Sequence, residues 1–170
     1  MKDNILLINI CKEKLHFYEF VKPVGDILVK NGFKGFIRHY SCLTKKDIEK
    51  ASKIIICGTS LFDNEFLGKA GKFDWIKKCN KPVLGICGGM HLIGLAFGGN
   101  LSNRNEIGYY KENFKKEFLG LKGGNEVYHL HNNYVDFSDL DFEIFSSSFQ
   151  GNISQAVKHK NRDIYGVLFH

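Results

Sequence analysis

The sequence predicts an α/β protein with an open, mostly parallel sheet, and three observations support this fold class. Short apolar runs alternate with segments of helical spacing from the start of the chain to Phe97. A glycine-rich turn joins the apolar run 83–86 directly to a helix. Beyond Gly98 and Gly99 the pattern changes to short β-prone segments, so we expect the second half to be rich in strands.

Each element follows from its local pattern. Residues 4–10 form an apolar run of strand length, which predicts a first buried strand. Further strands are expected over 35–39, 53–57 and 82–86, and helices over 17–31, 45–51, 66–78 and after Cys87, with a loop at 58–64. In the second half, the β-prone segments are 127–130, 143–148, 153–159 and 164–170. This order predicts one domain over residues 1–170, a three-layer, flavodoxin-like open sheet.

Composition limits the possible functions. The chain has 170 residues, 44% of them hydrophobic, and contains no apolar run near the roughly 20 residues of a membrane span. We therefore expect a cytoplasmic protein that does not bind membranes. The net charge of +6 comes from lysines scattered along the chain, which indicates a solvated surface and not a nucleic-acid site. Five cysteines without a Cys-x-x-Cys pair indicate free thiols.

The most informative segment is Gly85-Ile86-Cys87-Gly88-Gly89, where a buried strand passes through a sharp turn into a helix. Glycines on both sides allow a strained strand-to-helix turn that projects the thiol from the carboxyl edge of the sheet, the arrangement of a nucleophile elbow. The first N–H groups of the helix favour a thiolate and can hold an oxyanion. A buried structural cysteine is the alternative interpretation, but the glycine pattern favours chemistry.

Three strand ends are expected to meet at this edge. Ligands of open α/β sheets bind outside the carboxyl ends of the strands, here after Cys57, at Cys87 and after the last strand. The last strand leads to His170. A histidine at this place can act as the base for Cys87, although a terminal histidine taken alone is usually just an exposed residue.

At these residues the chain resembles the class I glutamine amidotransferases. Their cysteine lies in Gly-x-Cys-x-Gly-x-Gln and their histidine in Gly-Val-Gln-Phe-His-Pro-Glu; the corresponding segments here are 85–91 and 166–170. The resemblance also includes segments 54–58, 97–99, the region around His131, and 155–166. Among members, the chain looks most similar to the stand-alone amidotransferase subunits of archaeal two-subunit GMP synthases.

The resemblance implies a glutaminase mechanism without a cofactor. Cys87 would attack the side-chain carboxamide of glutamine, His170 would carry the proton to ammonia, and water would release glutamate from the thioester. Backbone N–H groups of Gly58 and Gly88 would form the oxyanion hole. A synthase partner would consume the ammonia, in GMP synthesis or another pathway.

Three features depart from the family pattern. The motif's Pro-Glu is not among these 170 residues, so we expect the triad to lack its carboxylate here. Position 91 is His instead of Gln; it shares a helix face with Cys87, so we expect it either to contact substrate or to be hydrogen-bonded beside the pocket. The oxyanion loop reads Gly58-Thr59-Ser60 in place of a Gly-Gly-Pro-like run.

Residues before Val135 complete the expected site. By the resemblance, His131 lies in a substrate-proximal loop, and Asn132 and Asn133 offer backbone contacts to the amino-acid end of the substrate. His129 and His131 would face the same side of a strand, but we expect no metal, because no Asp, Glu or Cys stands at recognisable ligand spacing.

Two other functions stay open. One is a cysteine hydrolase of related fold that acts on γ-glutamyl compounds or other amides. The other is a catalytically weak binding or regulatory module that keeps the pocket and docks a partner.

Overall fold

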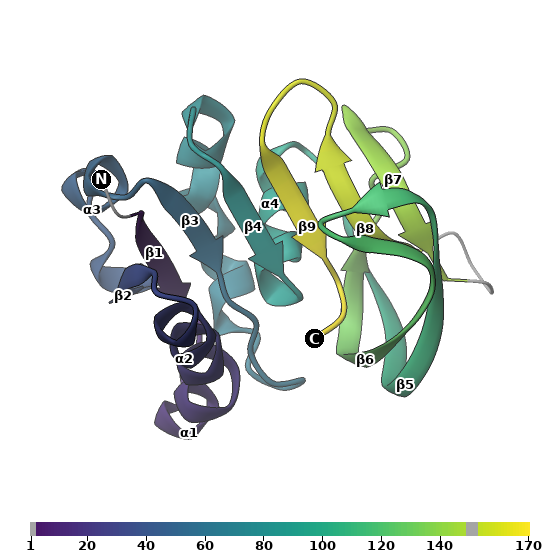
Figure 1. The fold of residues 1–170 in the computed structure, drawn as a ribbon, viewed down its shortest axis with the longest axis horizontal. Helices are drawn as coiled ribbons and strands as arrows, with labels where there is room; N and C mark the ends of the chain where they lie inside the picture. The colour runs from purple at the N-terminus through teal and green to yellow at the C-terminus, as the bar shows by residue number, and fades with distance from the viewer. Residues whose placement is uncertain (1–2, 149–152) are drawn as a thin grey trace.

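A computed structural model describes residues 3–148 and 153–170, and Figure 1 shows its fold. Within these residues, seven strands form one sheet in the order β2-β1-β3-β4-β9-β8-β7, and β5 pairs with β6 in a separate sheet. Strands β2, β1, β3, β4 and β9 run parallel, whereas β8 is antiparallel to both of its neighbours. The expected mostly parallel α/β fold with a strand-rich second half is confirmed.

The first half alternates strands and helices as expected. Its strands are β1 (Asn4–Asn9), β2 (Lys34–His39), β3 (Lys53–Ile56) and β4 (Val83–Ile86). Its helical segments are α1 (Lys14–His16), η1 (Phe17–Val21), α2 (Lys22–Lys30), η2 (Tyr40–Cys42), α3 (Lys45–Lys50), η3 (Glu65–Lys78) and α4 (Gly88–Ala96). The segments α1, η1 and α2 follow one another without a break, so together they form the helix expected over 17–31.

One helix differs in type from the expectation. The segment η3 is built from 3₁₀ turns and is kinked at Lys69, which has φ −119° and ψ 17°. Gly68 and Gly71 flank this kink, and glycine is a poor former of α-helix interiors. Apolar contacts hold the segment instead, since Phe66 and Phe73 are each 1% exposed.

The largest difference from the sequence prediction is a long hairpin. Strands β5 (Leu101–Phe118) and β6 (Leu121–Val135) pair antiparallel around a turn at Leu119 and Gly120, where both residues have positive φ. The sequence predicted only 127–130 as strand. Most β5 side chains are exposed, so the segment carries no regular alternation of apolar and polar residues that would predict a strand.

The remaining strands lie close to their expected places. They are β7 (Phe142–Ser147), β8 (Ser154–His159) and β9 (Ile164–Val167). The last strand was expected to reach His170, but it ends at Val167. Residues beyond it stay anchored by other bonds, because the Leu168 amide donates to the Gln155 carbonyl at 2.9 Å.

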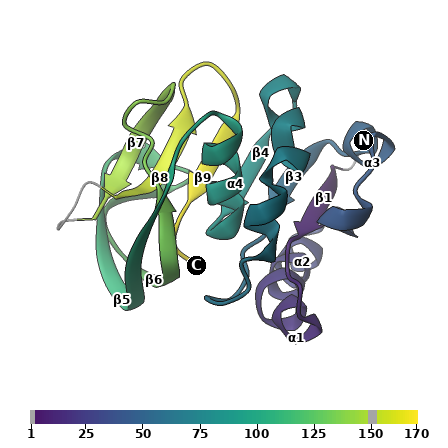
Figure 2. The ribbon, with the colours of Figure 1, turned by 180° about the vertical axis from the view of Figure 1, so that it is seen from behind.

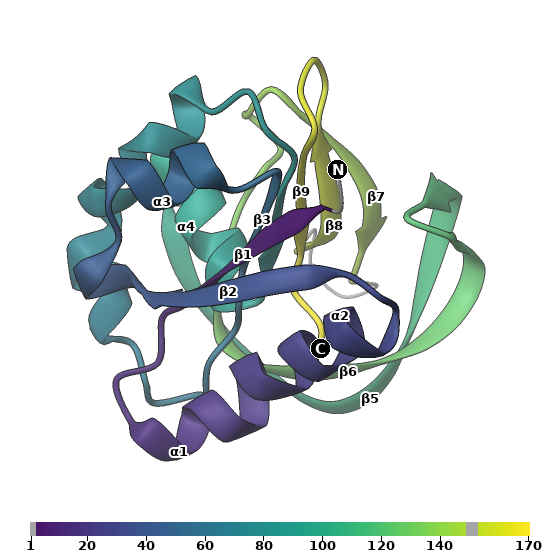
Figure 3. The same cartoon turned by 60° about the vertical axis from the view of Figure 1, so that its left-hand side comes forward.

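Helices cover both faces of the main sheet. Figure 1 shows α1 and α2 on the near face, and Figure 2 shows α4 on the other. Figure 3 gives the same arrangement along the sheet, with α3 and α4 on one side. The two faces have separate apolar clusters, with Ile8 and Ile56 in the larger and Leu7 and Cys57 in the smaller. None of the helices in the described ranges has the length and apolar composition needed to cross a membrane.

Candidate active site

The turn at Cys87 is the strained feature of this site. Cys87 has φ 49° and ψ −104°, a conformation that L-residues rarely adopt. Close packing explains the flanking glycines, because a Cβ on Gly85 would stand 2.6 Å from the Gly89 carbonyl. Backbone bonds hold the turn: the Cys87 amide donates to the Val167 carbonyl at 2.7 Å, and the Cys87 carbonyl accepts from the His91 amide at 3.1 Å. The strand–cysteine–helix elbow predicted from the sequence is therefore present.

The thiol of Cys87 is buried and protonated at neutral pH. Cys87 is 4% exposed, and its Sγ lies 3.7 Å from the Leu130 carbonyl oxygen. Burial raises the pKa of this thiol to about 12, and the Gly88 backbone N–H opposes the shift only in part. The helix N-terminus therefore lies beside the sulfur as expected, but it does not by itself produce a thiolate.

His170 and Gly58 lie beside the cysteine. A Cβ on Gly58 would stand 2.6 Å from Cε1 of His170 and 3.4 Å from Cβ of Cys87, so Gly58 lies between the two candidate catalytic side chains. The His170 amide donates to the Tyr128 carbonyl at 2.8 Å, and its ring packs on Phe20 with centroids 5.2 Å apart. The predicted convergence of the ends of β3, β4 and β9 is thus observed.

The imidazole of His170 is neutral in this environment. Although the residue as a whole is exposed at the chain end, the ring packs against Gly58 and Phe20, and the ring carries the nitrogens that titrate. Burial, followed by the charges of His131 and His129, lowers the pKa of His170 to about 4. At neutral pH the site therefore pairs a neutral thiol with a neutral imidazole.

The loop between β3 and η3 is fixed by one buried carboxylate. Asp63 Oδ2 accepts hydrogen bonds from Thr59 Oγ1 at 2.9 Å and from the Lys12 amide at 2.9 Å, and it lies 2.8 Å from His16 Nδ1. Asn132 Nδ2 also donates to the Leu61 carbonyl at 3.0 Å. The changed Gly58-Thr59-Ser60 sequence therefore stands in a loop that is tied to both neighbouring segments.

The cavity beside Cys87 is very small. Its volume is about 10 Å³, which is room for about one water molecule. Its lining residues are Thr59, Ser60, Leu61, Asn64, Phe66, Cys87, Gly88, His91, Leu130, His131 and Asn132. An amino-acid substrate therefore requires this cavity to open.

Three of the four expected substrate residues line this cavity: His91, His131 and Asn132. Asn133 does not. Its carbonyl lies 3.0 Å from His91 Nε2, and its side chain donates to Asn132 Oδ1 at 2.8 Å. Burial and the charge of His131 lower the pKa of His91 to about 4, so this ring is neutral and its Nδ1 lacks a hydrogen-bond partner among the described residues.

Sequence reasoning missed a carboxylate behind the cavity. It found no acidic partner for His129 and His131, but Glu106 Oε2 lies 3.1 Å from His129 Nδ1 and 3.0 Å from His131 Nε2. The pairing of β5 with β6 places Glu106 opposite His131. Since β5 was not predicted, sequence spacing gave no signal of this contact.

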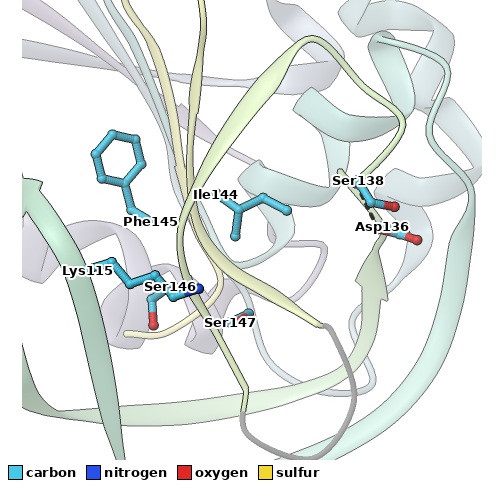
Figure 4. Close-up of a pocket in the computed structure, with 7 residues that line it drawn as sticks. All are labelled: Lys115, Asp136, Ser138, Ile144, Phe145, Ser146 and Ser147. Atoms are coloured by element: carbon cyan, nitrogen blue, oxygen red, sulfur yellow. Dashed lines mark hydrogen bonds between the residues drawn. The ribbon is translucent and has the colours of Figure 1, made fainter.

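A larger cavity of about 300 Å³ lies elsewhere, around β7. Figure 4 shows its lining residues, Lys115, Asp136, Ser138, Ile144, Phe145, Ser146 and Ser147. It shares none of them with the Cys87 cavity, and the lining contains no cysteine or histidine. The candidate active site is therefore at the elbow, in spite of the smaller volume there.

The mostly parallel sheet holds a strained cysteine at a strand-to-helix turn, and a histidine from the end of a neighbouring strand lies beside it. This arrangement defines a protein with a cysteine nucleophile elbow. Residues 17–170 match the family described as Glutamine amidotransferase class-I. The chain belongs to the class I glutamine amidotransferases.

Similar proteins include the A subunits of glutamine-hydrolyzing GMP synthases. The chain is 34% identical to that of Methanobrevibacter smithii, over 61% of this chain and 56% of the relative. It is 30% identical to that of Methanosphaera stadtmanae, over 85% and 87%. The match spans less than two thirds of the length of the Methanobrevibacter smithii relative. A crystal structure from Thermoplasma acidophilum, described as the A subunit of a GMP synthase, aligns over all of this chain and 84% of its own, with 25% identity and a TM-score of 0.84.

Proposed function

We propose that this chain is a glutaminase subunit that hydrolyses glutamine through a cysteine thioester and delivers ammonia to a synthase partner. The single observation that carries the proposal is the position of Gly58 between Cys87 and His170. The nucleophile, the base and an oxyanion donor then come from the ends of three adjacent strands. Similarity to the A subunits of GMP synthases supports GMP synthesis as the consuming reaction.

In the proposed reaction, Cys87 Sγ bonds to the side-chain carbonyl carbon of glutamine while the thiol proton passes to the His170 imidazole. Amides of Gly58 and Gly88 stabilise the negative oxygen of the tetrahedral intermediate. When the carbon–nitrogen bond breaks, the imidazolium returns its proton to the nitrogen, and ammonia leaves. His170 then takes a proton from water, whose oxygen attacks the thioester, and glutamate and the free thiol are released.

Partner control is part of the proposal. The cavity of about 10 Å³ excludes glutamine, and the buried thiol and imidazole are both neutral. Both features indicate a resting state with low activity, which a docked synthase would open. The changed sequence of the oxyanion loop would suggest slow turnover if the loop were loosely held, but hydrogen bonds to Asp63 fix it. The small volume of the cavity is therefore the better reason for low activity.

Two other functions remain as alternatives. His91 in place of the family glutamine favours a different amide substrate, because it lines the cavity with an imidazole. The small volume of the cavity favours a regulatory module of weak catalysis. We also propose a cytoplasmic location. The five cysteines are all free in the structure, and free thiols are typical of proteins in a reducing compartment.

The test uses a glutamine-mimicking electrophile and a glutaminase assay, with and without the synthase subunit encoded in the same genome. We expect label on Cys87, no label on Cys57 or Cys11, and glutamate release that rises when the synthase is added. The matched control is Cys42→Ser, which changes an exposed cysteine. Label on another cysteine in the folded protein would reject Cys87 as nucleophile, and activity unchanged by the synthase would reject partner control.

A further inference from the structure

A buried polar cluster joins the hairpin to the back of the Cys87 cavity. Its centre is Glu106 Oε2, which lies 3.1 Å from His129 Nδ1 and 3.0 Å from His131 Nε2. All three side chains are buried, and their ligand atoms lie within 4.8 Å of one another. We propose that Glu106, His129 and His131 bind a divalent transition-metal ion, for which Zn²⁺ is the best match.

Unpartnered ring nitrogens beside a carboxylate point to a cation as the ligand of this cluster. Both nitrogens of His131 lack a hydrogen-bond partner among the described residues, although Nε2 lies 3.0 Å from Glu106 Oε2. A nitrogen lone pair and a carboxylate oxygen repel each other at this distance unless a proton or a cation lies between them. Ligand atoms of a tetrahedral zinc site are separated by about 3.3 Å, given bonds of about 2.0 to 2.1 Å. The two measured separations are close to this value.

The charge of the cluster favours a divalent ion. Glu106 is 6% exposed and Glu112 is 4% exposed, so two carboxylates are buried in one network. Buried carboxylates need compensating positive charge. A bound ion of charge +2 would balance both carboxylates and would allow each histidine to be neutral, which is the form that binds metal.

Further polar side chains hydrogen-bond to the proposed ligands, as is usual around a bound metal. His129 binds with Nδ1, and its other nitrogen, Nε2, lies 3.3 Å from Glu112 Oε1. Metal-binding histidines usually donate the second N–H to such a carboxylate. Glu112 is itself fixed by Ser146 Oγ, which donates to its Oε2 at 2.6 Å, and Gln155 Nε2 donates to Glu106 at 2.6 Å. These bonds orient the ligands.

A second cavity gives an ion access to the cluster, and the types of ligand favour Zn²⁺. Glu106 and Glu112 both line a cavity of about 400 Å³ that shares no lining residue with the Cys87 cavity, so an ion can reach the carboxylates without passing Cys87. Two imidazoles and one carboxylate suit Zn²⁺ better than Mg²⁺ or Ca²⁺, which prefer oxygen ligands. Bound there, the ion would fix His131, which lines the Cys87 cavity, and would link β5 to β6, because Glu106 lies on β5 and both histidines lie on β6.

The experiment measures metal binding directly. The full chain, without a histidine tag, is stripped with EDTA, dialysed and titrated with ZnCl₂ by calorimetry, with the bound metal counted by elemental analysis. We expect one Zn²⁺ per chain with Kd below about 1 µM, and weakening of at least about 100-fold in Glu106→Gln. The matched control is Glu126→Gln, an exposed carboxylate on the same hairpin, which should bind as the wild type does.

Two results of the zinc titration would overturn the proposal: a wild-type chain that binds no Zn²⁺ at about 100 µM, or equal binding in wild type and folded Glu106→Gln. If circular dichroism shows that Glu106→Gln is unfolded, His131→Asn takes its place in the same comparison. The CoCl₂-loaded wild type gives a readout that needs no variant. Visible cobalt bands without sulfur-to-cobalt charge transfer support the His–Glu site, whereas charge transfer from cysteine sulfur would place the metal elsewhere and reject it.

Discussion

Gly58 and His170 are in such close contact that a Cβ on Gly58 would stand 2.6 Å from Cε1 of the imidazole. The base proposed for Cys87 can therefore occupy its position only if residue 58 has no side chain. Glycine is needed at position 58 because a side chain would collide with the imidazole. The backbone angles do not require glycine, since Gly58 is not among the positive-φ residues.

Substituting Gly58→Ala should displace the imidazole while the fold is kept. We expect the glutaminase rate, measured with the synthase partner present, to fall by about 10²-fold or more, the range for losing a positioned general base. The control is Gly68→Ala, where a Cβ would meet no atom within 4 Å. Equal rates in the two variants would mean that His170 does not act from the position seen here.

Alkylation should report the raised pKa of Cys87. Because burial raises this pKa to about 12, only a small fraction of the thiol is ionised at pH 7.5, and the thiolate is the reactive form. With iodoacetamide and the isolated chain, we expect the rate at Cys87 to rise about tenfold per pH unit from pH 7.5 to 9.5. Exposed Cys42 is the internal reference. Alkylation of Cys87 at pH 7 as fast as that of Cys42 would contradict the closed, neutral site.

Replacing Asp63 should loosen the oxyanion loop. Burial raises the pKa of Asp63, but hydrogen bonds from His16, Thr59 and the amides of Lys12 and Glu13 outweigh it, so the pKa lies below its ordinary value. A carboxyl with a lowered folded-state pKa stabilises the fold above its unfolded-state pKa, and this stability is lost as the pH falls below about 4. We expect Asp63→Asn to lower the free energy of unfolding at pH 7 by about 1 to 3 kcal/mol.

Urea unfolding at pH 7 and at pH 3 tests this expectation. The difference between Asp63→Asn and wild type should shrink at pH 3, because the carboxyl is then mostly protonated in the unfolded state and part of the stabilisation is lost. Asp74→Asn, at an exposed position, should match the wild type at both values. A difference that is the same at both pH values would show that the charge of Asp63 contributes nothing.

Adding Pro-Glu after His170 should increase the glutaminase rate. A carboxylate that accepts the Nδ1 proton fixes the tautomer and orientation of a catalytic imidazole. We expect a gain of about 10²- to 10⁴-fold over the 170-residue chain, and no gain when Pro-Gln is added instead. Each form is measured with and without His170→Ala. Full activity of His170→Ala without the extension would move the base to His91, which lies on α4 and lines the Cys87 cavity.

Local patterns predicted most of the fold because the elements of the first half are short, apolar and separated by clear turns. The elbow was predicted because its glycines stand next to a buried strand. The hairpin was not, because most side chains of β5 are exposed and its pairing depends on a partner strand. A register shift between Asn103 and Glu106 also interrupts the regular pairing, so the partner of each β5 residue cannot be counted from the sequence.

For the site, the sequence predicted which residues lie together, but it did not predict the small volume of the cavity or the protonation of the thiol. Cys87, Gly58 and His170 come together as expected because parallel strands place their carboxyl ends at one edge. The small cavity beside Cys87 is lined in part by Leu130 and His131, which come from the hairpin. Long-range packing of this kind leaves no local signal, so the position of Asn133 outside the cavity was missed as well.

The hydrogen bond from the Cys87 amide to the Val167 carbonyl spans 80 positions in sequence (167 − 87) and closes the junction between β4 and β9. Parallel pairing over such a separation forms slowly, because a long loop must be ordered before the contact gains anything. We therefore expect the junction between β4 and β9, and with it the elbow, to assemble late in folding. Hydrogen exchange at this one amide would reveal partly folded molecules that keep their helices and have no active site.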